Sequence, residues 1–109
     1  MKFTHTLALH TCISVLALLS GPVMAQSNAQ TLHTRATAAM CANCHGTEGH
    51  TVDGSAIPSL AGMPKDYMVL QLKAFKEGTR PATVMHQITK GLTDEQVNTL
   101  ATYYATIQR

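Results

Sequence analysis

The 109-residue sequence has no tryptophan and few other aromatic residues, which make up 5% of the chain. Charged residues are also few, at 13%. Large apolar side chains are therefore scarce, and a domain this small usually needs a disulfide, a metal or a cofactor to complete its core. The length allows one domain. The composition predicts a small domain organised around a group other than its own side chains.

Long apolar runs are lacking too, except near the N-terminus, where apolar residues dominate from Leu7 to Leu19. Small residues follow and end at Ala25, and this order predicts a secretory signal peptide over residues 1–25, cleaved after Ala25. The run is too short, and too interrupted by Thr11, Cys12 and Ser14, to span a membrane comfortably. An uncleaved N-terminal anchor is the alternative. We expect no stable membrane insertion of the mature chain.

An excess of charge of either sign is also missing. Cleavage removes Lys2, one of the eight basic residues, and none of the six acidic ones, so the mature chain over residues 26–109 is near +1. Nucleic acid is excluded as a partner, because binding it requires a basic face. We expect this domain in the periplasm, which is an oxidising compartment.

Only two cysteines remain after cleavage, in the stretch Cys41-Ala42-Asn43-Cys44-His45. Two thiols three positions apart lie on one helical turn, where both can add to the vinyl groups along one side of a porphyrin. The next residue, His45, then presents its imidazole to the iron. The pattern predicts one covalently bound haem c, attached through Cys41 and Cys44 with His45 as an iron ligand.

Three other interpretations of the two cysteines are weaker. A thioredoxin-like pair requires a strand, a turn and a helix, and no strand pattern precedes Cys41. A zinc site requires a second pair of ligands, and although His45, His50 and His86 are present, no second cysteine pair is. A disulfide between Cys41 and Cys44 closes almost no loop, so it adds little stability.

No strand pattern appears anywhere, and helical periodicity dominates. Ser27 and Gln30 make a capping-box pattern at the start of a first helix, which runs into the Cys41 turn. Glycines and Pro58 then mark an irregular segment over about 46–64.

Two more helices follow. Asp66 is the expected cap of one, which Gly78 ends, and Thr93 with Gln96 makes the capping box of the last. Residues 79–90 are expected to be mostly loop, with one short turn over 84–89. The apolar stripe of the last helix is Val97, Leu100, Ala101, Tyr104 and Ile107. The fold class is all-α, with three main helices and loops around one haem.

An iron bound by His45 has a sixth position that is either filled or open. Met85 is the candidate ligand, because it follows the loop of residues 78–84 and precedes the last helix, and so approaches from the face opposite His45. A thioether favours the ferrous state and raises the reduction potential relative to a second imidazole. His86 is the alternative ligand, and filling gaps in a core is the other common role of a methionine.

The stretch from Ile57 to Leu60 suggests how His45 is oriented. A ligating histidine usually donates its remaining ring N–H to a carbonyl. Pro58 has a carbonyl but no N–H, so it can accept that bond without leaving a buried donor unpaired. Leu60 would then pack on the porphyrin. An ordinary loop proline and a core leucine are the alternative.

These motifs resemble class I cytochromes c of the c4/c553-like group, over essentially all of the mature chain. The matching stretches are Cys41-Ala42-Asn43-Cys44-His45-Gly46, Pro58-Ser59-Leu60-Ala61-Gly62, Tyr67 to Gly78, Met85 to Asp94 and Leu100 to Ala105. The resemblance implies that Cys41 and Cys44 form the thioethers and that His45 and Met85 are the ligands. It also implies that the carbonyl of Pro58 orients His45.

The resemblance is closest to the cytochrome subunit of flavocytochrome c sulfide dehydrogenase, although many relatives of that subunit carry two haem domains and only one motif is present here. It implies an electron carrier with no catalytic residues of its own, a flavoprotein subunit as donor and another redox protein as acceptor. A diffusible shuttle between respiratory complexes and a terminal oxidase or peroxidase is the first alternative. A gas-binding or sensing cytochrome with an open sixth site is the second.

Overall fold

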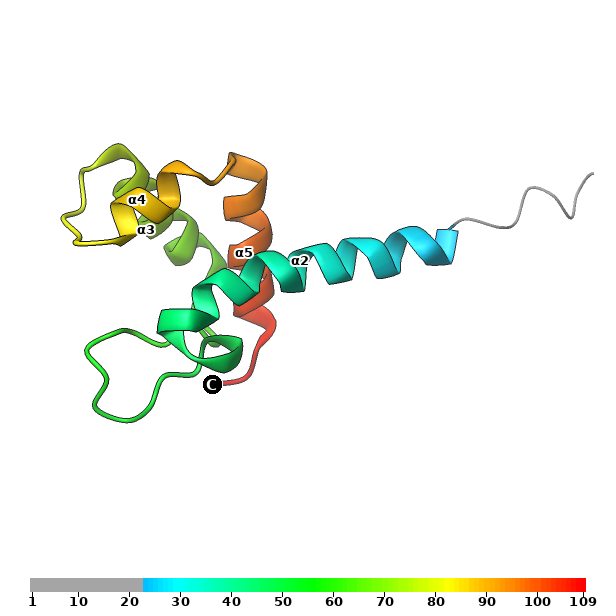
Figure 1. The fold of residues 1–109 in the computed structure, drawn as a ribbon, viewed down its shortest axis with the longest axis horizontal. Coiled ribbons are helices and arrows are strands. Elements are labelled where there is room, and N and C mark those ends of the chain that lie inside the picture. Colours follow the sequence, from blue (N-terminus) through cyan, green and yellow to red (C-terminus); the bar gives the residue numbers. More distant parts are fainter. Residues whose placement is uncertain (1–22) are drawn as a thin grey trace, which may run out of the picture. The chain divides into compact units, whose positions relative to one another are not determined.

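The computed structural model describes residues 23–109, and within them it contains helices and no strand (Figure 1). The helices are α2 (Val23–His45), α3 (Lys65–Glu77), α4 (Met85–Lys90) and α5 (Asp94–Thr106), with a short 3₁₀ helix, η2 (Thr47–Gly49). The predicted all-α class is confirmed. The predicted signal peptide lies almost wholly outside the described residues. Within residues 23–109, no helix combines the length and apolar character that crossing a membrane requires.

Residues 33–109 form one compact unit, which contains every predicted site residue. Helix α2 begins at Val23, so the predicted start at Ser27 is wrong by four residues. Ala25 and Gln26 are good helix formers, so the helix can begin before Ser27. The helix ends at His45 because Gly46 adopts φ 79°, and a Cβ there would lie 1.9 Å from the carbonyl oxygen of His50.

Helix α5 supplies most of the core of the second unit. As predicted, Thr93 and Gln96 form a capping box: the amide of Gln96 donates to the Thr93 hydroxyl, and the amide of Thr93 donates to the Gln96 side chain. The helix packs against α3. The core cluster consists of Ala38, Met68, Leu92, Val97, Leu100, Ala101 and Tyr104.

Helices α3 and α4 differ from the sequence prediction in detail. Pro64 is the N-cap of α3, whereas the predicted cap, Asp66, lies in the first turn, where a carboxylate favours the helix dipole. Gly78 ends α3 in the left-handed conformation, as predicted. Residues 85–90 form α4, which packs against α3. The sequence predicted one short turn over 84–89 in a segment that was otherwise expected to be loop. The buried Thr89 hydroxyl donates to the Met85 carbonyl and helps close this helix.

The irregular segment of residues 46–64 follows the C-terminal end of α2 and lies near the C-terminus (Figure 1). The carbonyl of Gly49 accepts two hydrogen bonds within this loop, one from the Leu60 amide at 2.8 Å and one from the Ser59 hydroxyl at 2.7 Å. The amide of Gly62 donates to the Tyr104 carbonyl. These bonds fold the segment back toward α5 and so place Pro58.

Candidate functional site: the C-terminal turn of α2

The last turn of α2 carries Cys41, Cys44 and His45. Both cysteines are free thiols; Cys41 is half-buried and packs against the core cluster, whereas Cys44 is exposed. His45 is 8% exposed. The helix therefore presents two thiols one turn apart, beside a buried imidazole.

A hydrogen bond fixes the orientation of His45. Its Nδ1 lies 2.7 Å from the carbonyl oxygen of Pro58. A carbonyl only accepts, so Nδ1 carries a proton and donates; in the neutral imidazole, Nε2 then keeps the lone pair that a metal requires. This is the contact that the sequence predicts for Pro58.

The other predicted site residues lie on separate segments. Leu60 is half-buried and packs against the core cluster. Met85 is half-buried at the start of α4, whose packing partner is α3. The structure thus joins His45 directly to Pro58, and places Met85 on a different element. The roles of Leu60 and Met85 toward a haem stay predictions.

These residues fit a covalently held haem. Two free thiols accompany an imidazole whose Nε2 is available, which is the donor set that the C-x-x-C-H pattern requires. Large apolar side chains on three segments also stay exposed: Ile57 at 40%, Leu70 at 62% and Val84 at 55%. A porphyrin offers apolar surface of the kind that covers such side chains. Among residues 23–109, no three His, Cys, Asp or Glu side chains are grouped to hold a metal ion, so the zinc interpretation finds no ligand set there.

Sequence reasoning placed Tyr104 only in the apolar stripe of α5, but its hydroxyl reaches the site. It donates to the Ala38 carbonyl at 2.9 Å, one turn before Cys41, which packs against the core cluster that contains Tyr104. Burial raises the pKa of the Cys41 thiol, and the nearby Tyr104 side chain partly offsets this; burial also raises the pKa of Tyr104. A tyrosine in an otherwise apolar stripe was the available signal, because a buried hydroxyl needs a partner.

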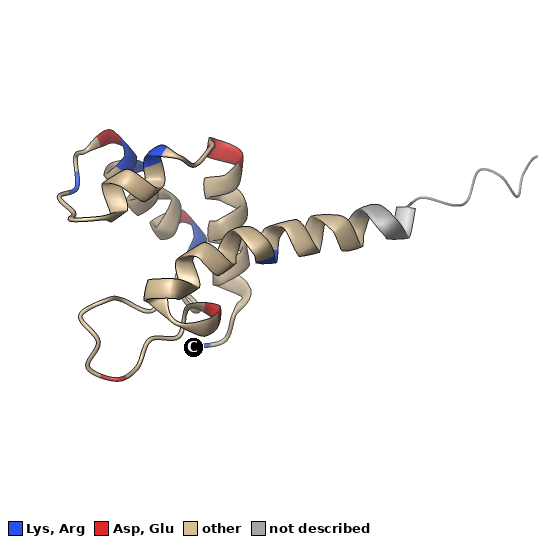
Figure 2. Ribbon diagram, viewed as in Figure 1, with Lys and Arg blue, Asp and Glu red and all other residues tan. Residues whose placement is uncertain are grey.

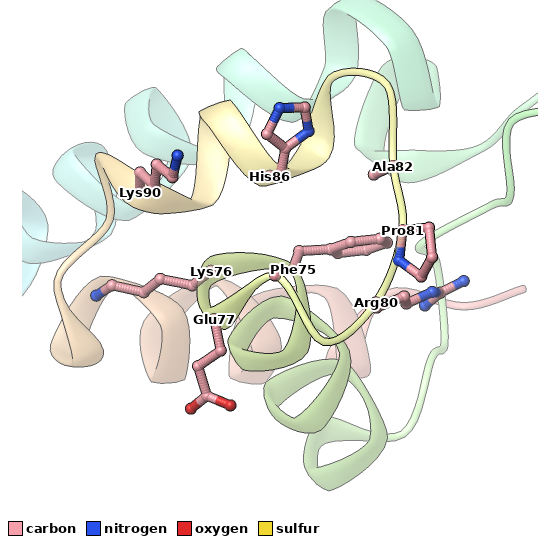
Figure 3. A pocket seen from close by; sticks show the side chains of 9 residues that line it. Phe75, Lys76, Glu77, Arg80, Pro81, Ala82, His86 and Lys90 are labelled. Carbon is pink, nitrogen blue, oxygen red and sulfur yellow. The ribbon is translucent and has the colours of Figure 1, made fainter.

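A pocket of about 330 Å³ lies apart from the α2 turn and is lined by residues of α3, α4 and the loop between them (Figure 3). It contains several cations, but Figure 3 shows the side chains of Lys76 and Arg80 pointing away from each other. Lys76 donates to the Leu92 carbonyl, and the Arg80 guanidinium lies 4.5 Å from the centre of the Phe75 ring. Figure 2 shows acidic and basic residues on several elements of the described fold. Lys76 and Arg80 therefore make contacts with their own fold.

Comparisons with known proteins identify the family of this chain. A protein-family model described as cytochrome c matches residues 30–108. The cytochrome subunit of sulfide dehydrogenase from Chlorobaculum tepidum is 39% identical over 69 residues, which cover 63% of this chain and 61% of that protein. The thiosulfate dehydrogenase electron acceptor from Thiomonas intermedia is 41% identical over 71 residues, 65% of this chain and 33% of that protein.

A solved structure gives the same result for the fold. Cytochrome c4 from Acidithiobacillus ferrooxidans superposes with a TM-score of 0.58 at 37% identity, over 62% of this chain and 38% of that chain. In each of these comparisons the match spans less than two thirds of the relative's own length.

Proposed function

This chain belongs to the cytochrome c family, and we propose that it attaches its single haem c through Cys41 and Cys44, with His45 and Met85 as iron ligands. Haem c, when bound, takes up and releases one electron. The hydrogen bond from His45 Nδ1 to the Pro58 carbonyl carries the proposal, because it fixes the tautomer that leaves Nε2 for the iron. Met85 would supply a thioether that favours the ferrous state.

The chain's own residues perform three tasks in this proposal. The two thiols hold the group covalently, so that a small core is sufficient. The Pro58 carbonyl holds the imidazole in place and keeps its proton on Nδ1. Burial of His45 shields this contact from competing water. None of these residues transforms a substrate, so we expect an electron carrier whose catalysis lies in a partner.

The proposed partner is a flavoprotein that donates electrons, with another redox protein as acceptor, in the periplasm. The relative from Chlorobaculum tepidum, which is named as a cytochrome subunit of sulfide dehydrogenase, supports this assignment. A freely diffusing carrier is the second candidate, supported by the relative that is named as an electron acceptor of thiosulfate dehydrogenase.

Gentle purification from the native periplasm, followed by an absorbance spectrum of the intact species, tests both. Haem bands together with flavin absorbance and a larger second polypeptide support the subunit. Haem bands on this chain alone support the diffusing carrier. A chain from which the haem is extracted by acid and organic solvent has no covalent link, and that result rejects the proposed site.

A further inference from the structure

Arg80 is an exposed arginine that is held to α3 at both its backbone and its side chain. Its amide donates to the Ala74 carbonyl at 3.1 Å. Its guanidinium lies 4.5 Å from the centre of the Phe75 ring, and its Nη1 donates to the side-chain oxygen of Gln71. Figure 3 shows the Phe75 ring extending from α3 toward Arg80 and Pro81. Three residues of one helix therefore fix this arginine.

Charge pairing does not explain the arrangement. Within residues 23–109, the ion pair that forms joins Lys76 to Asp94, and Arg80 takes part in none. Arg80 instead uses a neutral amide and an aromatic face. These contacts require a planar guanidinium, which stacks on a ring and points its N–H groups in fixed directions, as a lysine ammonium does not. The side chain therefore serves to fasten its own segment to α3.

That segment leads directly to Met85. Residues 78–84 connect α3 to α4, and Met85 is the first residue of α4. In the described part of the chain, no backbone hydrogen bond reaches residues 81–83. The next fixed point is Val84, whose carbonyl accepts from amides in the first turn of α4. Arg80 is thus the last anchored residue before the helix that begins with Met85.

Helix α4 is too short to hold Met85 in place by its own stability. A helix of six residues is marginal by itself and depends on its packing against α3. The residue that α4 buries completely, Thr89, lies near its C-terminal end, whereas Met85 at its start is half-buried. Movement of the loop therefore displaces the start of α4 before its end.

We propose that Arg80 is a positioning residue for the sixth iron ligand: by fastening the loop to α3, it holds the thioether of Met85 in place. The inference rests on the proposed role of Met85 as a ligand. Loosening the loop increases the fraction of molecules in which the sixth position is open. An added ligand binds only those molecules, so its apparent dissociation constant falls in proportion as the open fraction rises.

The test titrates free imidazole into the haem-loaded, ferric full chain and follows the absorbance spectrum. Arg80→Ala removes both guanidinium contacts, whereas Arg80→Lys keeps the charge without the planar group. Lys73→Ala is the matched control, because it removes one positive charge from an exposed position on α3. Urea unfolding of each variant measures its stability separately.

We expect Arg80→Ala to lower the apparent dissociation constant for imidazole about tenfold, which corresponds to about 1.4 kcal/mol. Arg80→Lys should lie closer to Arg80→Ala than to the parent chain, and Lys73→Ala should match the parent. Gln71→Ala removes one of the two side-chain partners of Arg80, so it should lower the constant by less, about threefold.

Met85→Ala shows whether the effect of Arg80 passes through Met85. This variant leaves the sixth position without its thioether, so it should bind imidazole more tightly than any Arg80 variant. Adding Arg80→Ala to Met85→Ala should then change the affinity no further, because the two changes act on the same contact.

Two results would overturn the inference. Arg80→Ala that binds imidazole like the parent, even if urea unfolds it more easily, would give Arg80 a purely structural role. A tenfold change that persists in the Met85→Ala chain would mean that Arg80 acts without Met85. Failure of the proposed ligand is distinguishable from both, because Met85→Ala alone would then leave the imidazole affinity unchanged, and that result rejects the ligand and the inference together.

Discussion

Two regions of the described fold are held together in different ways. The region of α3 and α5 buries apolar side chains, among them Val97 and Leu100, which are 0% and 2% exposed. The loop of residues 46–64 is held mainly by hydrogen bonds to backbone carbonyls, including the bond from His45 to Pro58. Apolar burial is non-directional, whereas hydrogen bonds fix atoms at defined positions. One region therefore supplies stability and the other supplies the geometry of the site.

The largest expected effect lies in the apolar region. Leu100→Ala should lower the free energy of unfolding by about 2–5 kcal/mol, because it removes buried methyl groups and leaves a cavity. Thr102→Ala, on the exposed face of the same helix, should change it by less than about 0.5 kcal/mol. Urea unfolding of the haem-loaded chain, followed by circular dichroism, measures both. Equal effects would contradict the division between the two regions.

The next effect lies in the loop, at two glycines that both have positive φ. A Cβ at Gly49 would lie 2.9 Å from Leu60 Cβ and from the Tyr104 ring, whereas a Cβ at Gly54 would meet nothing within 4 Å. Both Gly→Ala changes carry the left-handed backbone penalty, but only Gly49→Ala also adds a steric clash. We expect Gly49→Ala to cost about 1–3 kcal/mol more than Gly54→Ala.

The same urea titration compares these two variants. A similar loss of unfolding free energy for both variants would show that the loop around Gly49 shifts to accommodate the added methyl group. The close approach of Leu60 and Tyr104 would then not constrain the loop. A larger cost at Gly49 would show that the loop, although poor in buried side chains, is rigid where it meets α5.

In the apolar region, local sequence patterns predicted the start of α5 and the end of α3 correctly. The capping box of Thr93 and Gln96 and the ending of α3 at Gly78 are both decided by neighbouring residues. Where α4 lies, the sequence predicted only a short turn, because a helix of six residues has little intrinsic stability and depends on packing against α3. Helix propensity alone does not reveal such a contact.

In the site region, the chemistry of single residues was enough to predict one contact. Pro58 was predicted as an acceptor because it has a carbonyl and no N–H, and the bond to His45 is present. The bonds from Tyr104 to Ala38 and from His50 to Gln108 were missed, since their partners lie 66 and 58 positions apart. Such pairs depend on how α5 and the C-terminal residues return to α2 and its loop.

The smallest expected effect concerns the exposed bond that ties the loop to the C-terminal residues. His50 Nε2 donates to the Gln108 carbonyl at 2.8 Å. His50→Ala should lower the free energy of unfolding by no more than about 0.5–1.5 kcal/mol, because water replaces part of an exposed hydrogen bond. Amide hydrogen exchange should speed up at Leu60 and Gly62, whose amides close the loop, and stay unchanged at Leu100. His33→Ala, on the exposed surface of α2, is the control. Faster exchange spread evenly over the loop and α5 would mean that the two regions unfold as one unit, and the comparison between them would then fail.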